Sequence, residues 1–381
     1  MASILLAAKK NKNDEFYTQL SDIQVEMNNY LDKFKNKVVF CNCDDPFESN
    51  FVKYFLMNFN KLGLKELIAA GYKTNFIDDS KIINIPCALR ISETTKYLVG
   101  TKKDFDIKDI EYFFKTNKNQ IMIPLTGNAA LDENGNQIQI SIKRNEYDEK
   151  GNLLLDRKGN PKQKIINQNL YYEAGDFRSD MSIAFLKEAD IVVTNPPFSL
   201  FREYVTQLIE YKKNFLIIGN QNAIAYKKIF PLIKDNQIWF GNNFVKIFTL
   251  PDGTIKKFGN ILWFTNLDHI KRHQMLPLNL KFKYAEYKEM YLKYFNFNAI
   301  NVDKVSEIPS DYNGIMGVPI SFLDKYCPEQ FIILGCYEPA IKLSDYRKIS
   351  KFKSLPSRQV TINGVLCQKT YLRIFIQKKN L

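Results

Sequence analysis

The chain has 381 residues, of which 45% are apolar and 25% charged, so its composition is that of a globular protein and not of a disordered one. No run approaches 18 consecutive apolar residues, which excludes a membrane-spanning helix. Lys and Arg outnumber Asp and Glu by 54 to 41, and this excess favours a polyanionic partner.

The first 79 residues are expected to begin an α/β domain. Residues 18–34 form a helix-compatible run, and the apolar segment 38–43 predicts a short buried strand. Apolar residues spaced at three and four over 51–59 predict a helix. Residues 62–70 predict a second helix, with Gly71 as its stop.

Residues 80–168 interrupt this pattern. Turn clusters of the form Asp-x-x-Gly-Asn begin at Asp132, Asp148 and Asp156, and between them lie alternating segments such as 138–142. This combination predicts antiparallel hairpins and not helices. The stretch reads as an insertion in the α/β domain, and both DNA contact and simple surface decoration remain open for it.

Alternating strands and helices resume after residue 168. The expected strands are 170–174, 190–194, 215–218, 237–240 and 260–265, and the expected helices are 179–188, 201–211 and 224–234. Strands separated by helices of about ten residues predict a doubly wound parallel sheet. The alternation ends near residue 268, where a basic, aromatic-rich region begins.

The last 40 residues concentrate the positive charge. They carry one acid, Asp345, and ten basic side chains: Lys342, Arg347, Lys348, Lys351, Lys353, Arg358, Lys369, Arg373, Lys378 and Lys379. Aromatic residues are interleaved with these charges: Tyr337, Tyr346, Phe352 and Tyr371. The pattern favours nucleic acid as the partner; the alternative is a solvated basic tail.

The strand at 190–194 runs directly into Asn195-Pro196-Pro197-Phe198. An exocyclic amino nitrogen is a poor nucleophile, and the Asn195 side-chain oxygen and the Pro196 carbonyl are two acceptors for its N–H bonds. The prolines fix φ and supply no competing N–H, and Phe198 offers a face for base stacking. The tetrapeptide therefore indicates methylation of an amino group by positioning and electrostatics. The alternative is an ordinary Pro-Pro turn.

Other reactive residues are weaker candidates. His269 and His273 lie four apart and permit a metal site, but the sequence favours surface or DNA-facing positions, and no metal is expected. Cys41 and Cys43 alternate as core residues of a strand. Pro86-Cys87 resembles the nucleophile of cytosine-5 methylation but has no acid partner. The six cysteines form no disulfide framework and, with no signal peptide expected, are read as reduced thiols of a cytoplasmic protein.

Carboxylates near a methyl donor are expected just after the strands. Asp44 and Asp45 follow the first strand, and Asp176-Phe177 follow a later one. Each carboxylate has an alternative role as a turn or helix cap.

Several segments together resemble the EcoRI-type adenine-specific DNA methyltransferases, the modification enzymes of type II restriction systems. They are the segments 12–19, 39–46, 175–179, 190–201 and 311–320. The resemblance covers about residues 10–79 and 168–335; the stretch 80–168 is longer than expected, 241–259 is shorter, and the last 40 residues match poorly. The first-strand turn also lacks the glycines usual among methyltransferases at large.

The resemblance implies a Rossmann-like, S-adenosylmethionine-dependent fold with a seven-stranded sheet and a C-terminal target-recognition region, to which the turn clusters of residues 80–168 add a β-hairpin insertion. It implies a donor-binding start at 1–79, the insertion at 80–168, the catalytic remainder at 169–267 and a basic DNA-recognition region at 268–381. The donor-site residues that it implies are Asp14, Phe16, Tyr17, Thr18, Asn42, Asp44, Asp176 and Phe177. Asn195, Pro196, Pro197 and Phe198 are implied to hold the target base.

The implied activity is methyl transfer from S-adenosylmethionine to the N6 of an adenine flipped out of double-stranded DNA, with S-adenosylhomocysteine as product. A monomer in a prokaryotic cytoplasm, associated with the nucleoid and paired in function with a restriction nuclease, is expected. Alternatives are methylation of RNA adenine or of a protein glutamine, and a catalytically silent DNA-binding protein of the same fold. The recognition sequence need not be that of the EcoRI enzyme.

Overall fold

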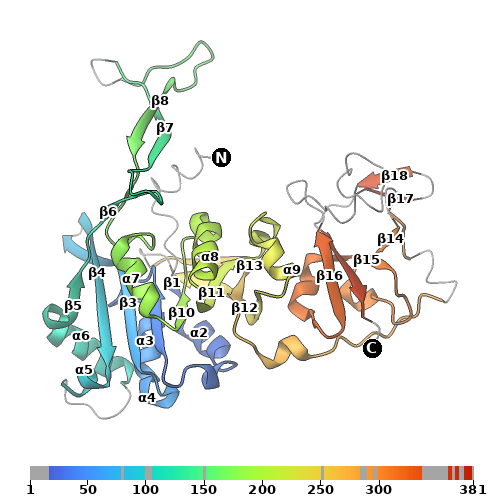
Figure 1. The fold of residues 1–381 in the computed structure, drawn as a ribbon, viewed down its shortest axis with the longest axis horizontal. Coiled ribbons are helices and arrows are strands. Elements are labelled where there is room, and N and C mark those ends of the chain that lie inside the picture. Colours follow the sequence, from blue (N-terminus) through green and yellow to red (C-terminus); the bar gives the residue numbers. More distant parts are fainter. Residues whose placement is uncertain are drawn as a thin grey trace. The chain divides into compact units, whose positions relative to one another are not determined.

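The computed structural model describes residues 17–78, 81–98, 105–148, 152–249, 253–283, 290–294, 298–336, 359–362, 365–368 and 373–379. The chain divides into two compact units. The first contains Asn36–Ser199 and the second contains Thr18–Lys35 with Leu200–Leu381. Figure 1 labels most of the helices and strands of both. Among the described residues, no helix has the length and apolar character needed to cross a membrane.

The first unit is built on five neighbouring strands in the order β10-β2-β3-β4-β5. They are β2 (Val38–Asn42), β3 (Glu66–Asp78), β4 (Lys81–Ser92), β5 (Met122–Pro124) and β10 (Ile191–Thr194). Both β10 and β3 pair with β2 in parallel, whereas β4 is antiparallel to β3 and to β5. The sheet is therefore mixed and not wholly parallel as predicted. Every residue of β2 and β10 is buried, as their unbroken apolar runs require.

The first unit has five α-helices among its described residues, and one further helix that the sequence predicted is instead a strand. The five helices are α3 (Asn50–Met57), α4 (Phe59–Leu62), α5 (Glu93–Leu98), α6 (Ile107–Ile121) and α7 (Asp180–Glu188). Gly63, at φ 62°, ends α4, and the expected helix over 62–70 is mostly the strand β3. Parallel pairing with β2 buries the apolar run Leu67–Ala70 in the sheet, and this tertiary burial overrides the helical spacing.

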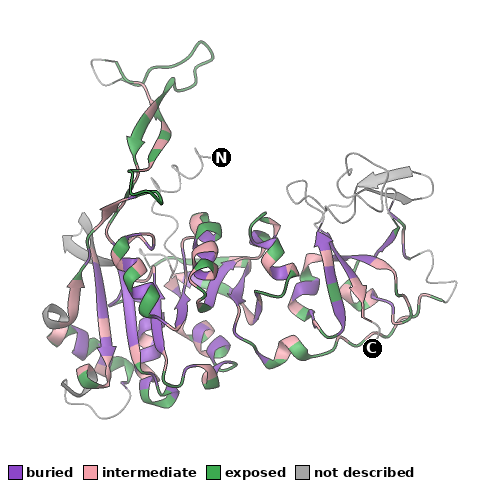
Figure 2. Ribbon diagram, viewed as in Figure 1, coloured by how far each residue is buried: buried purple, intermediate pink, exposed green. Residues whose placement is uncertain are grey.

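The stretch 80–168 contains more than hairpins. It contributes β4 to the sheet of the first unit and forms the 15-residue helix α6. The prediction of hairpins without helices for this stretch is therefore wrong. Antiparallel pairing is present in β7 (Gln139–Asn145) and β8 (Gln163–Asn169). The short strands β6 (Asn128–Ala129) and β9 (Tyr171–Tyr172) pair at the base of this hairpin. Figure 1 shows it extending from the sheet, and Figure 2 shows it mostly exposed.

The second unit contains a three-stranded antiparallel array in the order β12-β13-β11. Its elements are α2 (Leu20–Met27), α8 (Phe201–Glu210), β11 (Asn214–Asn220), α9 (Phe230–Lys234), β12 (Trp239–Thr249) and β13 (Ile255–Thr265). The helix predicted at 201–211 and the strands at 215–218 and 260–265 are confirmed. The helix expected at 224–234 is shorter, because η3 (Gln221–Ala225) occupies its start. Gly219 of β11 leaves room for the Phe201 ring, since a Cβ there would lie 2.4 Å from it.

A second sheet, in the order β14-β15-β19-β16, follows in the same unit. Its strands are β14 (Ala299–Asn301), β15 (Ile315–Pro319), β16 (Phe331–Cys336) and β19 (Arg373–Lys378), and β17 (Gln359–Ile362) pairs with β18 (Val365–Gln368) nearby in sequence. The remaining elements are β1 (Tyr17–Thr18), η1 (Leu31–Lys33), η2 (Phe198–Leu200), η4 (Ile270–His273), η5 (Val305–Glu307) and η6 (Ile320–Lys325).

One basic residue of the last 40 has a structural role. Arg373 is buried, and its guanidinium donates to the side chains of Asn301 at 3.1 Å and Asp303 at 2.9 Å. It therefore holds β19 to β14, so this residue fits neither the predicted nucleic-acid contact nor the alternative of a solvated basic tail. Lys378 and Lys379 are half-buried, and the other seven basic residues of that stretch lie outside the described residues, as do its interleaved aromatics.

A buried carboxylate joins α2 to β12. Glu26 has no exposed surface, and it accepts hydrogen bonds from the Asn242 and Asn243 backbone N–H groups at 2.8 Å, from the Asn243 amide and from the Tyr30 hydroxyl. Burial raises its pKa, and these hydrogen bonds partly offset that effect. Gly241 is required beside it, since a Cβ would lie 2.3 Å from the carboxylate.

Replacing Glu26 by alanine is expected to lower the free energy of unfolding by about 3 kcal/mol or more, because several buried donors would lose their acceptor at once. Val25→Ala, on the exposed side of the same helix, is the matched control and should change it by no more than about 0.5 kcal/mol. Urea unfolding monitored by circular dichroism measures both. A loss below about 1 kcal/mol for Glu26→Ala would show that the carboxylate is not required.

Candidate active site

Two of the predicted site residues, Asp44 and Asn195, lie at one edge of the first unit's sheet. Strands β2 and β10 are parallel neighbours, with Val39 opposite Ile191 and Phe40 opposite Val192. Their carboxyl ends therefore lie side by side, which is where open α/β sheets place their ligands. Asp44 follows one strand and Asn195 follows the other.

Asp44 links these two strand ends directly. Its carboxylate accepts hydrogen bonds from the Thr194 hydroxyl, from the Ser49 hydroxyl at 3.0 Å and from the backbone N–H of Asn195. Burial of the carboxylate raises its pKa to about 7, and the three hydrogen bonds oppose that rise. A carboxyl group that was predicted for the donor site is therefore hydrogen-bonded to the first residue of the tetrapeptide.

The turn between β2 and Asp44 is unusually tight. Cys43 has φ 69°, in the left-handed region, so it takes the conformation that a glycine usually supplies at such a turn. Cys41 is a buried core residue as predicted, but Cys43 belongs to this turn and not to the strand. Gly71 of β3 allows the close approach, since a Cβ there would lie 2.2 Å from the Asp44 carbonyl oxygen. Its expected role as a helix stop is wrong.

Asn42 adds a polar group to the same turn. Its side-chain oxygen accepts the Cys43 backbone N–H at 3.0 Å. Its amide nitrogen is buried and has no hydrogen-bond acceptor within the described part of the chain. A buried N–H without an acceptor is costly, so this nitrogen is suited to a ligand's acceptor atom.

The neighbouring Asp45 fits the alternative structural reading. Its carboxylate accepts the backbone N–H groups of Phe47 at 2.9 Å and Glu48 at 3.3 Å, which makes it a turn cap. Ser49 is the N-cap of α3, accepting from the Phe51 N–H while donating to Asp44. Sequence reasoning missed Ser49 and Thr194 as parts of the site. A hydroxyl residue immediately before Asn195, at the end of a buried strand, was the available signal for Thr194.

The tetrapeptide itself lies where β10 leaves the sheet. Pro196 is buried, and Asn195, Pro197 and Phe198 are half-buried. Phe198 begins η2, which leads into α8. The roles of these four residues in holding a base stay predictions.

Asp176 and Phe177 precede α7, the helix that leads into β10. The Asp176 carboxylate is held by the Arg178 guanidinium through contacts of 2.9 and 2.7 Å and also accepts the Arg178 N–H, while Ser179 caps the helix. Phe177 is buried, and Arg178 lies over its ring at 5.1 Å. This ion pair fixes the position of the Asp176 carboxylate. Contact of Asp176 and Phe177 with the adenine of a methyl donor stays a prediction.

The N-terminal donor residues are only partly described. Thr18 is buried and Tyr17 half-buried in β1, whereas Asp14 and Phe16 lie outside the described residues. Their predicted contact with a methyl donor therefore stays a prediction.

Cys87, whose Pro-Cys context resembles the nucleophile of cytosine-5 methyltransferases, is a core residue. Cys87 is fully buried in β4, and burial raises the pKa of its thiol to about 12. The thiolate that such a reaction needs is therefore disfavoured at neutral pH.

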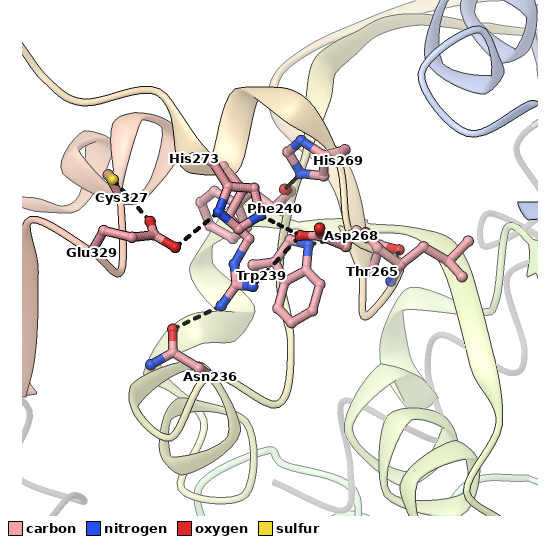
Figure 3. Close-up of polar contacts among 11 residues, drawn as sticks. Asn236, Trp239, Phe240, Thr265, Asp268, His269, His273, Cys327 and Glu329 are labelled. Carbon is pink, nitrogen blue, oxygen red and sulfur yellow. Dashed lines mark hydrogen bonds and ion pairs between the residues drawn. The ribbon is translucent and has the colours of Figure 1, made fainter. Parts of the chain in front are cut away.

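The two histidines occupy different environments (Figure 3). His269 is buried, its Nε2 lies 3.0 Å from the Phe240 carbonyl oxygen, and burial lowers its pKa, so the predicted surface position is wrong. His273 is at the surface between two carboxylates, with Nε2 2.7 Å from Asp268 and Nδ1 2.9 Å from Glu329. The Cys327 thiol donates to the same Glu329, and Arg272 lies beside Asp268 and stacks 3.7 Å from the Trp239 ring.

These contacts predict a pH-dependent stability. The hydrogen bonds to Asp268 and Glu329 raise the pKa of His273, so the stability that its charged ring contributes is complete below the unfolded pKa near 6.5. That contribution is lost as the pH rises through the folded pKa. His273→Gln is therefore expected to lower the urea midpoint at pH 6 and to have a smaller effect at pH 9. An equal effect at both pH values would contradict this coupling.

Comparison with known proteins identifies the family. A family model described as "Adenine-specific methyltransferase EcoRI" matches residues 4–379. The chain belongs to this family of adenine-specific methyltransferases. It is 40% identical to the type II methyltransferase M.EcoRI of Escherichia coli, covering 99% of this chain and 97% of that protein. It is 33% identical to M.MgeORF184P of Mycoplasma genitalium and 32% identical to M.MpnI of Mycoplasma pneumoniae, with 98% of this chain covered in both. No solved structure matches the chain.

Membership in the EcoRI methyltransferase family extends over parts of the chain that the motifs alone left out. The match includes residues 80–168 and most of the last 40 residues, so the predicted resemblance over 10–79 and 168–335 was too narrow. The chain is therefore a methyltransferase. Its candidate site links Asp44 to the start of Asn195-Pro196-Pro197-Phe198 through the hydrogen bonds described above.

Proposed function

We propose that this protein transfers a methyl group from S-adenosylmethionine to the N6 nitrogen of an adenine in duplex DNA, as the modification enzyme of a type II restriction system. The observation that carries the proposal is the hydrogen-bonded link from Asp44 through Thr194 and Asn195 to the tetrapeptide. Family membership supplies the adenine-directed chemistry. The parallel pairing of β10, β2 and β3 supports a Rossmann-like assignment of the fold.

The residues at the carboxyl edge suit this donor. S-adenosylmethionine supplies an activated methyl group and carries positive charge, so a buried carboxylate near it is favourable. Asp44 offers that carboxylate, and the buried Asn42 amide nitrogen offers a donor to a ligand oxygen or ring nitrogen. We assign Tyr17, Thr18, Asn42, Asp44, Asp176 and Phe177 to the donor site, together with Asp14 and Phe16.

The tetrapeptide would orient the target amino group. The Asn195 side-chain oxygen and the Pro196 carbonyl accept its two N–H bonds and hold the nitrogen lone pair toward the methyl group. Pro196 and Pro197 present no backbone N–H that would compete for these acceptors. The protein's own contribution is then orientation and electrostatic stabilisation of the charge that develops on nitrogen.

The target base must leave the helix to reach this site. Flipping costs on the order of a few kcal/mol in unstacking, and stacking on Phe198 would offset part of it. We further propose that the enzyme acts as a monomer on DNA in the cytoplasm and is paired in function with a restriction nuclease. This functional pairing does not require physical contact between the two enzymes.

Replacing Phe198 by alanine is expected to lower kcat/KM about tenfold or more on a fully paired duplex, since stacking on an aromatic ring contributes about 1–3 kcal/mol per base. On a duplex with a mismatch at the target adenine the loss should be smaller, because that base flips at lower cost. Steady-state kinetics on matched and mismatched duplexes measure the two effects. Equal losses on both would contradict stacking of the flipped base.

The proposed function is tested by transfer of a labelled methyl group from S-adenosylmethionine to unmethylated bacterial DNA. Nucleoside analysis should find N6-methyladenine, and strand sequencing should place it at one recurring short sequence. Label in RNA but not in DNA, or no transfer at all, would refute the proposal.

A further inference from the structure

The two-stranded ribbon β7–β8 has two chemically different faces. Its register places Gln139 opposite Asn169, Ser141 opposite Asn167 and Lys143 opposite Ile165. Because side chains alternate along a strand, these residues share one face. This amide face consists of Gln139, Ser141, Lys143, Asn145, Gln163, Ile165, Asn167 and Asn169. The opposite face consists of Ile140, Ile142, Arg144, Lys164, Ile166 and Gln168.

The amide face is directed to solvent and is polar. All its members are exposed except Asn145, which is half-buried, whereas the three isoleucines of the opposite face are half-buried. Ile165, the apolar member of the amide face, is 68% exposed. The ribbon therefore presents five side-chain amides, a lysine and one apolar side chain to a partner.

The charge of the ribbon favours a nucleic acid as that partner. The 14 residues of β7 and β8 include Lys143, Arg144 and Lys164 and no Asp or Glu. A surface with basic residues and no acid attracts phosphates. A side-chain amide pairs bidentately with the N6 and N7 atoms of adenine, and an apolar group contacts the thymine methyl.

The dimensions also fit duplex DNA. The major groove is about 12 Å wide and admits a two-stranded β-ribbon. Strands of seven residues extend about 20 Å at roughly 3.3 Å per residue. With base pairs spaced about 3.4 Å apart, this length matches about six of them, the size of a short recognition site.

The base of the ribbon is attached to the element that leads to the catalytic strand. The Asn128 side-chain oxygen accepts the Asp180 backbone N–H at 2.8 Å, and the Thr126 hydroxyl lies 3.3 Å from the Met181 sulfur, both at the start of α7. Gly127 allows this fit, since a Cβ would lie 2.5 Å from the Tyr172 carbonyl oxygen. Helix α7 runs into β10 and Asn195.

We propose that the amide face of β7–β8 enters the major groove of the substrate duplex and reads base edges there, and so helps to set the recognition sequence. This proposal rests on the proposed DNA methylation and adds a specificity element within residues 80–168. The amides select adenine-containing pairs, Ile165 contacts a thymine methyl, and Arg144 and Lys164 on the opposite face balance phosphate charge.

The test compares single substitutions on the two faces. Gln139→Ala, Asn167→Ala and Asn169→Ala alter the amide face, and Gln168→Ala, the sequence neighbour on the opposite face, is the matched control. The wild-type site is first mapped by strand sequencing. Then kcat/KM is measured on the cognate duplex and on duplexes that each carry one changed base pair. Donor affinity, measured for every variant, verifies the fold.

At least one amide-face variant is expected to lose about tenfold or more of its discrimination at a defined base pair, with Gln168→Ala retaining the wild-type profile. The ribbon proposal is overturned if all three amide-face variants keep that profile, or if Gln168→Ala changes it equally. In either case a wild-type enzyme that methylates DNA leaves the proposed function intact. A wild-type protein that methylates no DNA refutes the proposed function itself.

Discussion

Asn195→Ala is expected to lower kcat by about 100-fold or more while changing the dissociation constant of the methyl donor by less than about threefold. The side-chain oxygen is one of two acceptors proposed for the target amino group, and its loss leaves the nitrogen lone pair without orientation. The hydrogen bond from the Asn195 backbone N–H to Asp44 does not involve the side chain, so the donor region should be preserved.

This result is measured by single-turnover methyl transfer and by calorimetric titration of the donor. Asn60→Ala is the matched control, because it removes an exposed asparagine side chain from α4 of the same unit. It should leave kcat within about twofold of the wild-type value. Retention of wild-type turnover by Asn195→Ala would exclude the assigned role.

Asp44→Ala is expected to produce the other large effect, a loss of about 100-fold or more in kcat/KM together with weaker donor binding. The substitution removes the acceptor shared by Ser49, Thr194 and the Asn195 N–H, so the donor turn and the catalytic turn lose their link. Ser49→Ala removes only one of these bonds and should have a much smaller effect. Equal losses for the two variants would show that the bonds from the Asp44 carboxylate to Thr194 and to the Asn195 N–H contribute nothing.

The raised pKa of Asp44 also predicts a pH effect on donor binding. Burial raises that pKa to about 7, so in the donor-free protein the carboxylate becomes ionised as the pH rises toward neutrality. A cationic donor binds the ionised form better, and its affinity should therefore fall as the pH decreases below about 7. Conversely, burial of this charge makes the folded state less stable as the pH rises from about 4 to 7. Asp44→Asn, titrated over the same range, should show neither dependence.

Most of the candidate site could be predicted from short segments of the sequence. The apolar run before Asn195 indicates a buried strand, and the residue types of the tetrapeptide indicate amino methylation. Asp44 was identifiable because an acid after the first strand of an α/β fold lies at the ligand edge. Spacing alone left Asp44 and Asp45 equivalent and the family resemblance favoured Asp44, but the hydrogen bonds that distinguish the two carboxylates form only in the folded turn.

Local periodicity failed where pairing with a distant strand determined the structure. Residues 66–70 were predicted as part of a helix but lie in β3, because the segment pairs with β2 on one edge and β4 on the other and its residues Leu67–Ala70 are buried. Arg373 belongs to a basic stretch in the sequence, yet it is buried in the fold and forms an ion pair with Asp303, 70 residues away.

The sequence by itself determined the family of this protein and the candidates for its site, because the family motifs, the tetrapeptide and the acid after the first strand are short patterns of residue type. Only the tertiary structure decided which polar groups meet. Parallel pairing of β2 with β10 places Asp44 beside Thr194, 150 residues away, and chain folding places His273 between Asp268 and Glu329. The physical reason is that side-chain types and local spacing are written along the chain, whereas burial and hydrogen-bond partners depend on contacts between segments distant in sequence.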